Sequence, residues 1–287
     1  MSKIMLSAFA DEYSENFEEQ LKALNEFSIP YIEIRGVDGT NVSELSLEKA
    51  KEIKAKLDAY NIKVWSIGSP LGKVNLDYPF EKHLEVCENV FKVANILDCD
   101  KVRVFSFFTK DYEGVKDEVI SRLNKMCALA KAYGVTLYHE NEKDIFGDSA
   151  ERCKLLLDSV QWLKCVYDPA NFVQCKVDVN GAMEILDGKI DYYHIKDAFN
   201  ATGYVTPAGK GDGEIKKLIE KIKIEETVLT LEPHLVVFKG YDQIDKSKLV
   251  NFFAYRTSRD AFMDAVKHLK DILIEIGYKE NDRVWTK

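Results

Sequence analysis

Short runs of β-branched and aromatic residues alternate with longer amphipathic stretches along the whole chain. The short runs are typical of strands, whereas apolar side chains spaced three or four residues apart are typical of one face of a helix. Eight segments are predicted as strands: IMLSAF (4–9), YIEIR (31–35), KVWSIG (63–68), KVRVFSF (101–107), VTLYHE (135–140), KCVYD (164–168), IDYYHIK (190–196) and TVLTLE (227–232).

Helical patterns fill the intervals between these strands. The clearest cover residues 15–27 and 47–60, each with a single apolar face. A last helix is expected over residues 258–277, where Gly277 provides a stop signal. About eight helices therefore accompany the eight strands.

Regular alternation of strand and helix predicts a parallel sheet, because parallel neighbours need a crossover connection. Eight repeats in 287 residues fit an α/β fold of the closed (β/α)8 TIM-barrel type. The alternative, a doubly wound open sheet, usually has a glycine-rich first turn, whereas the first turn here, AFADEYSEN (8–16), contains no glycine. No linker divides the sequence, so we expect one domain over residues 1–287 with its active site at the carboxyl ends of the strands.

The composition narrows the function classes without naming one. The chain is 46% hydrophobic and 31% charged, and no apolar run reaches the roughly 18 residues of a membrane helix. Acidic residues follow the first strand too soon for a signal peptide, and six cysteines without a CxxC pair indicate reduced, mostly buried thiols. We therefore expect a cytoplasmic protein. A net charge of −8 argues against a nucleic-acid partner.

Candidate chemistry lies where the last four strands end, because TIM barrels carry their active sites there. These ends read HENE (139–142), YDPAN (167–171), YHIKD (193–197) and LEPH (231–234). Each strand end offers an acid or an imidazole, namely Glu140, Asp168, His194 and Glu232. Successive members are separated by about one strand–helix repeat, which places them on adjacent strands. Any one alone would suit a solvated loop or a helix cap, but four on consecutive strands favour a metal site.

Three carboxylates and one imidazole suit a divalent ion such as Mn²⁺, with Mg²⁺, Co²⁺ and Zn²⁺ as alternatives. Asp168 and Glu232 both precede proline, which favours extended backbone at each acid. Strand alternation prevents His139 and Glu140 from both facing inward. Glu140 and Glu142 share one parity, and we choose Glu140 as the ligand.

With these strand ends, the sequence resembles the xylose-isomerase-like TIM-barrel superfamily, which includes D-tagatose 3-epimerase-like enzymes, inosose isomerases and dehydratases, and endonuclease IV. The resemblance runs through nearly the whole chain and implies that the four strand-end residues form the metal site. YIEIRG also resembles the E-L-R signature of the family and supplies Glu33 and Arg35. PAGKGDGEI (207–215) resembles the glycine-rich loop that follows the HIKD strand.

Three departures separate the chain from individual members. Ketose 3-epimerases carry a substrate-binding histidine three residues after the metal aspartate, and Asn171 stands there instead. The loop after the metal histidine contains no arginine. Endonuclease IV needs additional histidines, and the third and fourth strands provide none, which argues against a DNA-repair role.

The resemblance implies proton abstraction next to a carbonyl, through an enediolate, by an isomerase or epimerase of a monosaccharide or sugar phosphate. Glu140 and Glu232 would be the catalytic acids and bases. We expect five side chains to bind the substrate: Arg35, Lys196, His234, Trp65 and Asn171. Lys73 and Lys210 could bind a phosphate group on the substrate, although neither lies in a recognised phosphate loop.

Two other functions stay open at this stage. The same metal site could serve a dehydratase of an inosose-like keto-polyol, with Glu142, His139 or His234 as the acid beside the leaving hydroxyl. A non-catalytic sugar-binding barrel would be expected to lose a ligand, and the set of four is intact. The expected partner is a small sugar or polyol, with neither nucleic acid nor membrane, and relatives of this kind are often homo-oligomers.

Overall fold

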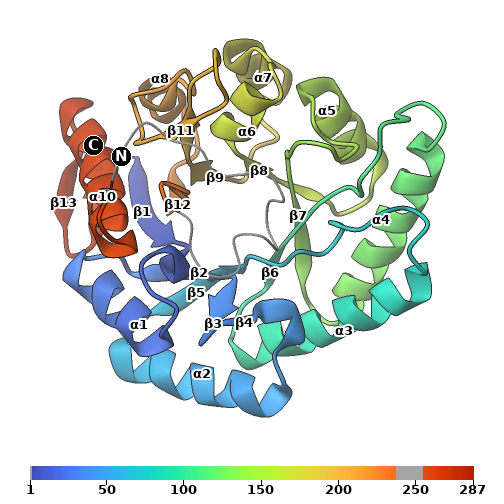
Figure 1. Ribbon diagram of the computed structural model, residues 1–287, viewed down its shortest axis with the longest axis horizontal. Helices are drawn as coiled ribbons and strands as arrows, with labels where there is room; N and C mark the ends of the chain where they lie inside the picture. The colour runs from blue at the N-terminus through green and yellow to red at the C-terminus, as the bar shows by residue number, and fades with distance from the viewer. Residues whose placement is uncertain (1, 237–254) are drawn as a thin grey trace.

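The computed structural model describes residues 2–236 and 255–287, and these residues fold as an α/β barrel. All eight predicted strands are present in the barrel wall, within one or a few residues of the predicted bounds. They are β1 (Lys3–Ala8), β2 (Tyr31–Ile34), β5 (Lys63–Ile67), β6 (Lys101–Val104), β7 (Thr136–Glu140), β8 (Lys164–Tyr167), β9 (Tyr192–Ile195) and β12 (Glu226–Leu231). Figure 1 looks along the barrel, with these strands inside a ring of helices.

Neighbouring wall strands run parallel, from β2 through β5, β6, β7, β8, β9 and β12 to β1. β1 and β2 lie side by side and close the ring, but no hydrogen-bonded ladder joins them in the described part of the chain. The free side of β1 instead pairs with a hairpin formed by β13 (Lys279–Asn281) and β14 (Val284–Thr286). Trp285 on β14 is buried, so this antiparallel addition, which the alternation did not predict, completes the core at the seam.

Helices cover the outside of the wall and begin at side-chain caps where the sequence offers them. The bounds are α1 (Phe17–Glu26), α2 (Leu47–Tyr60), α3 (Phe80–Ile96), α4 (Lys116–Ala132), α5 (Ala150–Ser159), α6 (Pro169–Gln174), α7 (Val179–Ile185), α8 (Ile215–Glu220) and α10 (Ser258–Glu275). Asn16, Ser46 and Thr257 cap the three helices predicted most clearly. Gly277 adopts a φ of 95° just beyond α10, as the predicted stop requires.

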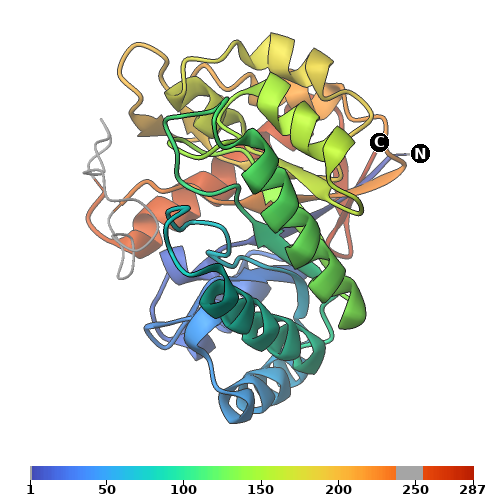
Figure 2. The ribbon, with the colours of Figure 1, turned by 90° about the vertical axis from the view of Figure 1, so that its right-hand side faces the viewer.

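Short elements line the carboxyl ends of the strands. They are the 3₁₀-helices η1 (Ala10–Glu12) and η2 (Val42–Glu44) and the two-stranded ribbons β3 (Gly36–Val37) with β4 (Thr40–Asn41) and β10 (Asp197–Ala198) with β11 (Val205–Thr206). Figure 2 shows from the side how loops and helices gather around the barrel. The loops at this end therefore define the surroundings of any strand-end site.

Most of the cysteines are buried, as their pattern in the sequence predicted. All six cysteines are free and five of them are buried. Among the residues that the structure describes, no helix is both long and apolar enough to cross a membrane. The expectation of a single domain over residues 1–287 takes in residues 1 and 237–254, which lie outside the described residues, and it stays a prediction.

Candidate metal centre

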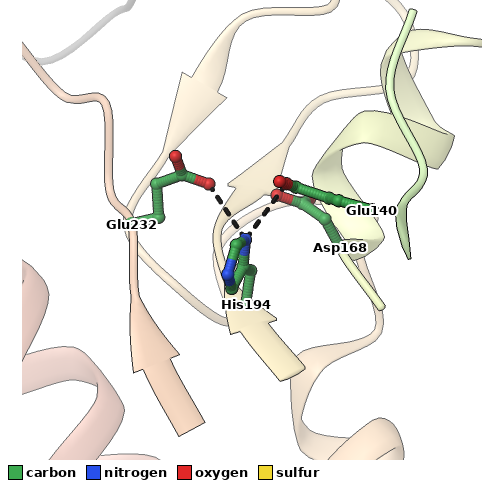
Figure 3. Close-up of side chains that lie close together, drawn as sticks. All are labelled: Glu140, Asp168, His194 and Glu232. Atoms are coloured by element: carbon green, nitrogen blue, oxygen red, sulfur yellow. Dashed lines mark hydrogen bonds and ion pairs between the residues drawn. The ribbon is translucent and has the colours of Figure 1, made fainter. Parts of the chain in front are cut away.

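Four side chains from four neighbouring strands converge at the carboxyl end of the barrel. Glu140 ends β7, Asp168 follows β8, His194 lies within β9, and Glu232 follows β12. One ligand atom of each lies within 4.8 Å of the other three, and each residue is at most 1% exposed. Figure 3 shows the three carboxylates arranged around the His194 ring. The structure thus brings together the set that the strand ends suggested.

His194 faces acids with both of its ring nitrogens. Nδ1 lies 3.0 Å from Glu140 Oε1 and 3.3 Å from Glu232 Oε2, while Nε2 lies 3.2 Å from Glu33 Oε2. If Nε2–H donates to Glu33, the lone pair of Nδ1 points at two carboxylates. This arrangement is favourable only when a proton or a metal ion lies between Nδ1 and the carboxylates. Without a metal, burial lowers the pKa of His194, but Glu140 and Glu33 outweigh this and raise it well above its usual value.

Asp168 presents one oxygen without a hydrogen-bond partner. Pro169 begins α6, and Asp168 caps that helix by accepting the Asn171 N–H at Oδ1, at 2.9 Å. The other oxygen, Oδ2, is buried with no hydrogen bond, although Lys196 Nζ lies 3.0 Å away outside hydrogen-bonding geometry. Burial raises the pKa of Asp168 to about 7 against the opposing charge of Lys196. A buried oxygen of this kind is a suitable donor for a metal ion.

Arg103 on β6 fixes one oxygen of Glu140. Its Nη1 donates to Glu140 Oε2 at 2.7 Å, and its Nη2 donates to the Gly68 carbonyl at 2.9 Å. The guanidinium carbon also lies 5.4 Å from the centroid of the Phe9 ring. Oε1 of Glu140 is therefore the oxygen that faces His194.

Arg35 on the opposite side fixes one oxygen of Glu232. Nη1 donates to Glu232 Oε1 at 2.9 Å, Nη2 donates to Glu12 Oε1 at 3.1 Å, and Asp11 accepts from both Nε and Nη2 at 2.9 Å. The Arg35 guanidinium carbon lies 4.4 Å from the centroid of the Phe9 ring that Arg103 also approaches. The two acids proposed to move protons are thus held in similar ways.

The charges around the cluster keep both glutamates ionised. Burial raises the pKa of Glu140, but His194 and Arg103 oppose it and hold the pKa well below its ordinary value. Burial likewise raises the pKa of Glu232, but Lys196 and hydrogen bonds hold it well below its ordinary value. Within the described residues, six buried or nearly buried carboxyl groups lie in contact with the site and three basic side chains face them: Asp11, Glu12, Glu33, Glu140, Asp168, Glu232, Arg35, Arg103 and Lys196. Such a surplus of carboxyl groups over basic side chains, together with the imidazole donor, fits a divalent metal ion.

Of the predicted substrate contacts, four lie in the site and one does not. Lys196 reaches the cluster directly, while Arg35, His234 and Asn171 bind its acids: Asn171 Nδ2 donates to Glu140 Oε1 at 3.2 Å, and His234 Nε2 lies 3.4 Å from Glu232 Oε1. The prediction that Trp65 binds the substrate is corrected. Its ring packs against Tyr31, Lys101 and Tyr192, the first residues of β2, β6 and β9. The ring therefore lies toward the amino ends of the strands, away from the cluster at their carboxyl ends.

His139 and Glu142, which flank the cluster, each make a polar contact with another side chain. His139, next to Glu140, lies 3.0 Å from Ser106 Oγ through Nε2, as strand alternation requires. Glu142 pairs with Lys73 at 2.9 Å, and their side chains are 12% and 7% exposed. Both belong to loops at the carboxyl end of the barrel. Their ion pair therefore lies beside the site and retains some access to solvent.

The glycine-rich loop is arranged around an aspartate. Asp197 Oδ2 accepts the N–H groups of Gly209 and Gly211 at 2.9 and 3.0 Å, and Oδ1 accepts that of Gly213 at 2.8 Å. These backbone donors are thus committed to a carboxylate inside the protein. The loop that carries Lys210 consequently lacks the free amide cradle that a phosphate-binding loop needs.

Arg103, Asp11 and Glu12 belong to the site, and the sequence reasoning did not single them out. Arg103 interrupts the apolar run KVRVF within a predicted strand, and a lone basic residue in such a run is a signal for a buried partner. Asp11 and Glu12 follow the first strand in AFADE. Their partner lies on another strand, so no local spacing connects them.

Comparisons with known proteins agree with the barrel fold. The sequence profile described as Xylose isomerase-like TIM barrel matches residues 21–272. No curated protein sequence gives a significant match. Among solved structures, the IolI protein with a binding zinc atom has a TM-score of 0.71 and 18% identity, covering 94% of this chain and 98% of its own.

Two further structures have similar scores and belong to proteins described with different activities. The probable 3-DHS dehydratase AsbF from Bacillus anthracis has a TM-score of 0.70 and 18% identity, covering 94% of this chain and 99% of its own. D-psicose 3-epimerase from Clostridium cellulolyticum H10, solved with D-tagatose, has a TM-score of 0.70 and 14% identity, covering 93% and 98%. At these identities the likeness concerns the fold.

Proposed function

The chain belongs to the xylose isomerase-like TIM barrel family, and from this premise we propose that it is a divalent-metal-dependent isomerase or epimerase of a monosaccharide or sugar phosphate. The observation that carries the proposal is the buried set Glu140, Asp168, His194 and Glu232, whose ligand atoms lie within 4.8 Å of one another. Mn²⁺ is the ion we propose, because the donors are three carboxylates and one imidazole.

The proposed reaction moves a proton at a carbon next to a carbonyl, through an enediolate. When bound, the divalent ion supplies Lewis-acid stabilisation of negative charge on substrate oxygens. Glu140 and Glu232 lie on either side of His194, each with one oxygen held by an arginine and the other directed inward. One glutamate would remove the proton and the other would return it.

Both glutamates are weak bases in this environment, because their pKa values are held low. Their immobility partly offsets that weakness: the carboxylates need no reorganisation, and their burial keeps water from competing for the proton. Asp168 and His194 would hold the ion without moving protons. Glu33, which faces His194 Nε2, would fix the tautomer that leaves Nδ1 free to coordinate.

Lys196 is the strongest remaining candidate for direct substrate contact. Its ammonium is buried and lies 3.0 Å from Asp168 Oδ2 and 3.5 Å from Glu232 Oε2, so it borders the proposed ion and one proposed base. An ammonium there can donate to a substrate hydroxyl or to the oxygen that gains charge. Arg35, Asn171 and His234 would instead act on the substrate through the acids that they hold.

The second candidate is a dehydratase of an inosose-like keto-polyol that uses the same metal set. Loss of a β-hydroxyl needs an acid beside the leaving group. Of the three acids considered, His139 faces Ser106 and His234 contacts Arg35 and Glu12, whereas Glu142 lies at the edge of the site with a partly exposed carboxyl group. Glu142 and the fold shared with AsbF, described as a probable 3-DHS dehydratase, favour this alternative.

The deciding experiment is incubation of the Mn²⁺-loaded protein in D₂O with a panel of ketoses, inososes and their phosphates, followed by NMR and mass spectrometry. A deuterated isomer that disappears with EDTA supports the isomerase or epimerase. A product lighter by one water supports the dehydratase, and Glu142→Gln should then lower its formation.

The Glu232→Gln variant separates catalysis from binding. An enzyme should lose turnover, because the amide cannot accept a proton, whereas a sugar-binding barrel should retain ligand affinity. Ligand binding that is unchanged in Glu232→Gln, with no turnover by the wild-type protein, would contradict the proposal.

A further inference from the structure

A second set of ligand-type atoms adjoins the first and shares one carboxylate with it. Glu12, Glu232 and His234 each place a donor atom within 4.8 Å of the other two, and all three residues are at least nine-tenths buried. They come from different ends of the chain, since Glu12 lies in η1 and the other two follow β12. By donor chemistry alone this set would also suit a divalent ion.

A guanidinium already lies among these donors. Arg35 Nη1 lies 2.9 Å from Glu232 Oε1 and 3.3 Å from His234 Nε2, and Arg35 Nη2 lies 3.1 Å from Glu12 Oε1. Asp11 accepts two further bonds from Arg35 at 2.9 Å. The side chain is 3% exposed, so these acids supply the contacts that water would otherwise supply.

An arginine in this position has two consequences. Guanidinium keeps its proton at any ordinary pH, so its positive charge excludes a second cation under all working conditions. It also holds Glu232 Oε1, so that Oε2 is the oxygen directed at His194 Nδ1 and Lys196. The orientation of Glu232 toward the first site therefore depends on Arg35.

We propose that the Arg35 guanidinium occupies a second cation site, which limits the barrel to one divalent ion and makes Arg35 a positioning residue for Glu232. The inference rests on the proposed metal site for its role in catalysis. The cation site itself rests on the contacts of Arg35 alone. The two claims can therefore be tested separately.

The test is the number of Mn²⁺ ions bound per chain, measured by equilibrium dialysis and elemental analysis on the full-length protein. The wild type should bind one ion. Arg35→Ala should bind two, because it removes the charge and opens space among the donors, and the second ion should be lost in Arg35→Ala combined with Glu12→Gln. Guanidinium chloride at tens of millimolar should displace the second ion from Arg35→Ala.

Arg122→Gln is the matched control. It removes an arginine that donates to the Leu76 carbonyl and to Glu118, away from both donor sets found among the described residues. It should therefore still bind one ion, and so should Arg35→Lys, which keeps a cation in place. Arg35→Gln serves in place of Arg35→Ala if the alanine variant does not fold, with two ions again expected.

The inference is overturned if folded Arg35→Ala or Arg35→Gln binds no more ions than the wild type. It is also overturned if the wild type binds two ions, which the electron paramagnetic resonance of an exchange-coupled Mn²⁺ pair would reveal without any variant. A wild type that binds no ion contradicts the proposed function instead. In that case a single ion gained by Arg35→Ala and lost with Glu12→Gln would still support the second cation site.

Discussion

Arg103 Nη1 lies 2.7 Å from Glu140 Oε2, and the two side chains are 4% and 2% exposed. The same guanidinium donates to the Gly68 carbonyl at 2.9 Å. The pair joins β6 to the end of β7 inside the barrel, where water cannot replace either partner. Glu140 therefore depends on Arg103 for both its charge balance and its orientation.

Removing this arginine should destabilise the protein strongly. We expect Arg103→Met to lower the free energy of unfolding by about 3–5 kcal/mol, because an unpaired buried carboxylate remains. Arg103→Lys should cost less, since it keeps the charge but cannot serve both acceptors. Urea denaturation of the metal-free proteins measures both. A loss below about 1 kcal/mol in Arg103→Met would show that Glu140 finds another partner.

Binding of a divalent ion should stabilise the fold, and the effect should require Asp168. At an Mn²⁺ concentration one hundred times the dissociation constant, the stabilisation is about 2.7 kcal/mol, visible as a higher melting temperature. Asp168→Asn should abolish this shift while keeping the helix cap, because the amide oxygen can still accept the Asn171 N–H.

Asp178→Asn is the matched control for that experiment. Asp178 caps α7 in the way Asp168 caps α6, but it is exposed. The Asp178→Asn protein should keep the full Mn²⁺-dependent shift in a calorimetric scan. Equal shifts in both variants would remove Asp168 from the proposed ligand set.

Asp197 should control the order of the glycine-rich loop. Asp197→Asn exchanges one acceptor oxygen for an amide NH₂ group, a donor that would face the backbone donors, and the lost charge-assisted bonds are worth about 1.5–3 kcal/mol each. We expect faster amide exchange at Gly209, Gly211 and Gly213, measured by hydrogen–deuterium exchange. Asp212→Asn, which alters an exposed acid of the same loop, should leave these rates near those of the wild type. Unchanged exchange in Asp197→Asn would contradict the assigned role.

His83 should make stability fall as the solution becomes acidic. Burial, and then the charge of Arg122, lower the pKa of His83 to about 4, and its Nε2 accepts the Gly72 N–H at 3.1 Å. Because the folded pKa lies below the unfolded value of about 6.5, the stabilising effect is complete above pH 6.5 and declines as pH falls toward 4. The shift corresponds to about 3 kcal/mol.

Urea denaturation across pH 4 to 7 tests this dependence. His83→Gln keeps an acceptor for the Gly72 N–H but cannot take up a proton at these pH values, so its stability should fall less steeply with acid than that of the wild type. Parallel curves for the two proteins would assign the pH dependence to other groups.

Much of the architecture could be predicted from the sequence, because it depends on neighbours along the chain. Runs of β-branched residues specify strands, and the glycine after the last helix specifies its end. Strand alternation separates Glu140 from His139, and the proline after Asp168 fixes where β8 stops and α6 begins. These signals operate over a few residues, so the sequence alone could place four strand-end groups on adjacent strands.

The partners of those groups were decided only by the tertiary structure. Arg35 and Glu232 are 197 positions apart, and nothing in either segment indicates their contact. Trp65 was misplaced because its height along the barrel depends on the stagger of the strands, which local pattern does not encode. The seam hairpin likewise depends on closure of the ring, and the loop around Asp197 depends on contacts between residues 12 to 16 positions apart. The sequence determined which residues reach the strand ends, and packing determined which charges neutralise one another there.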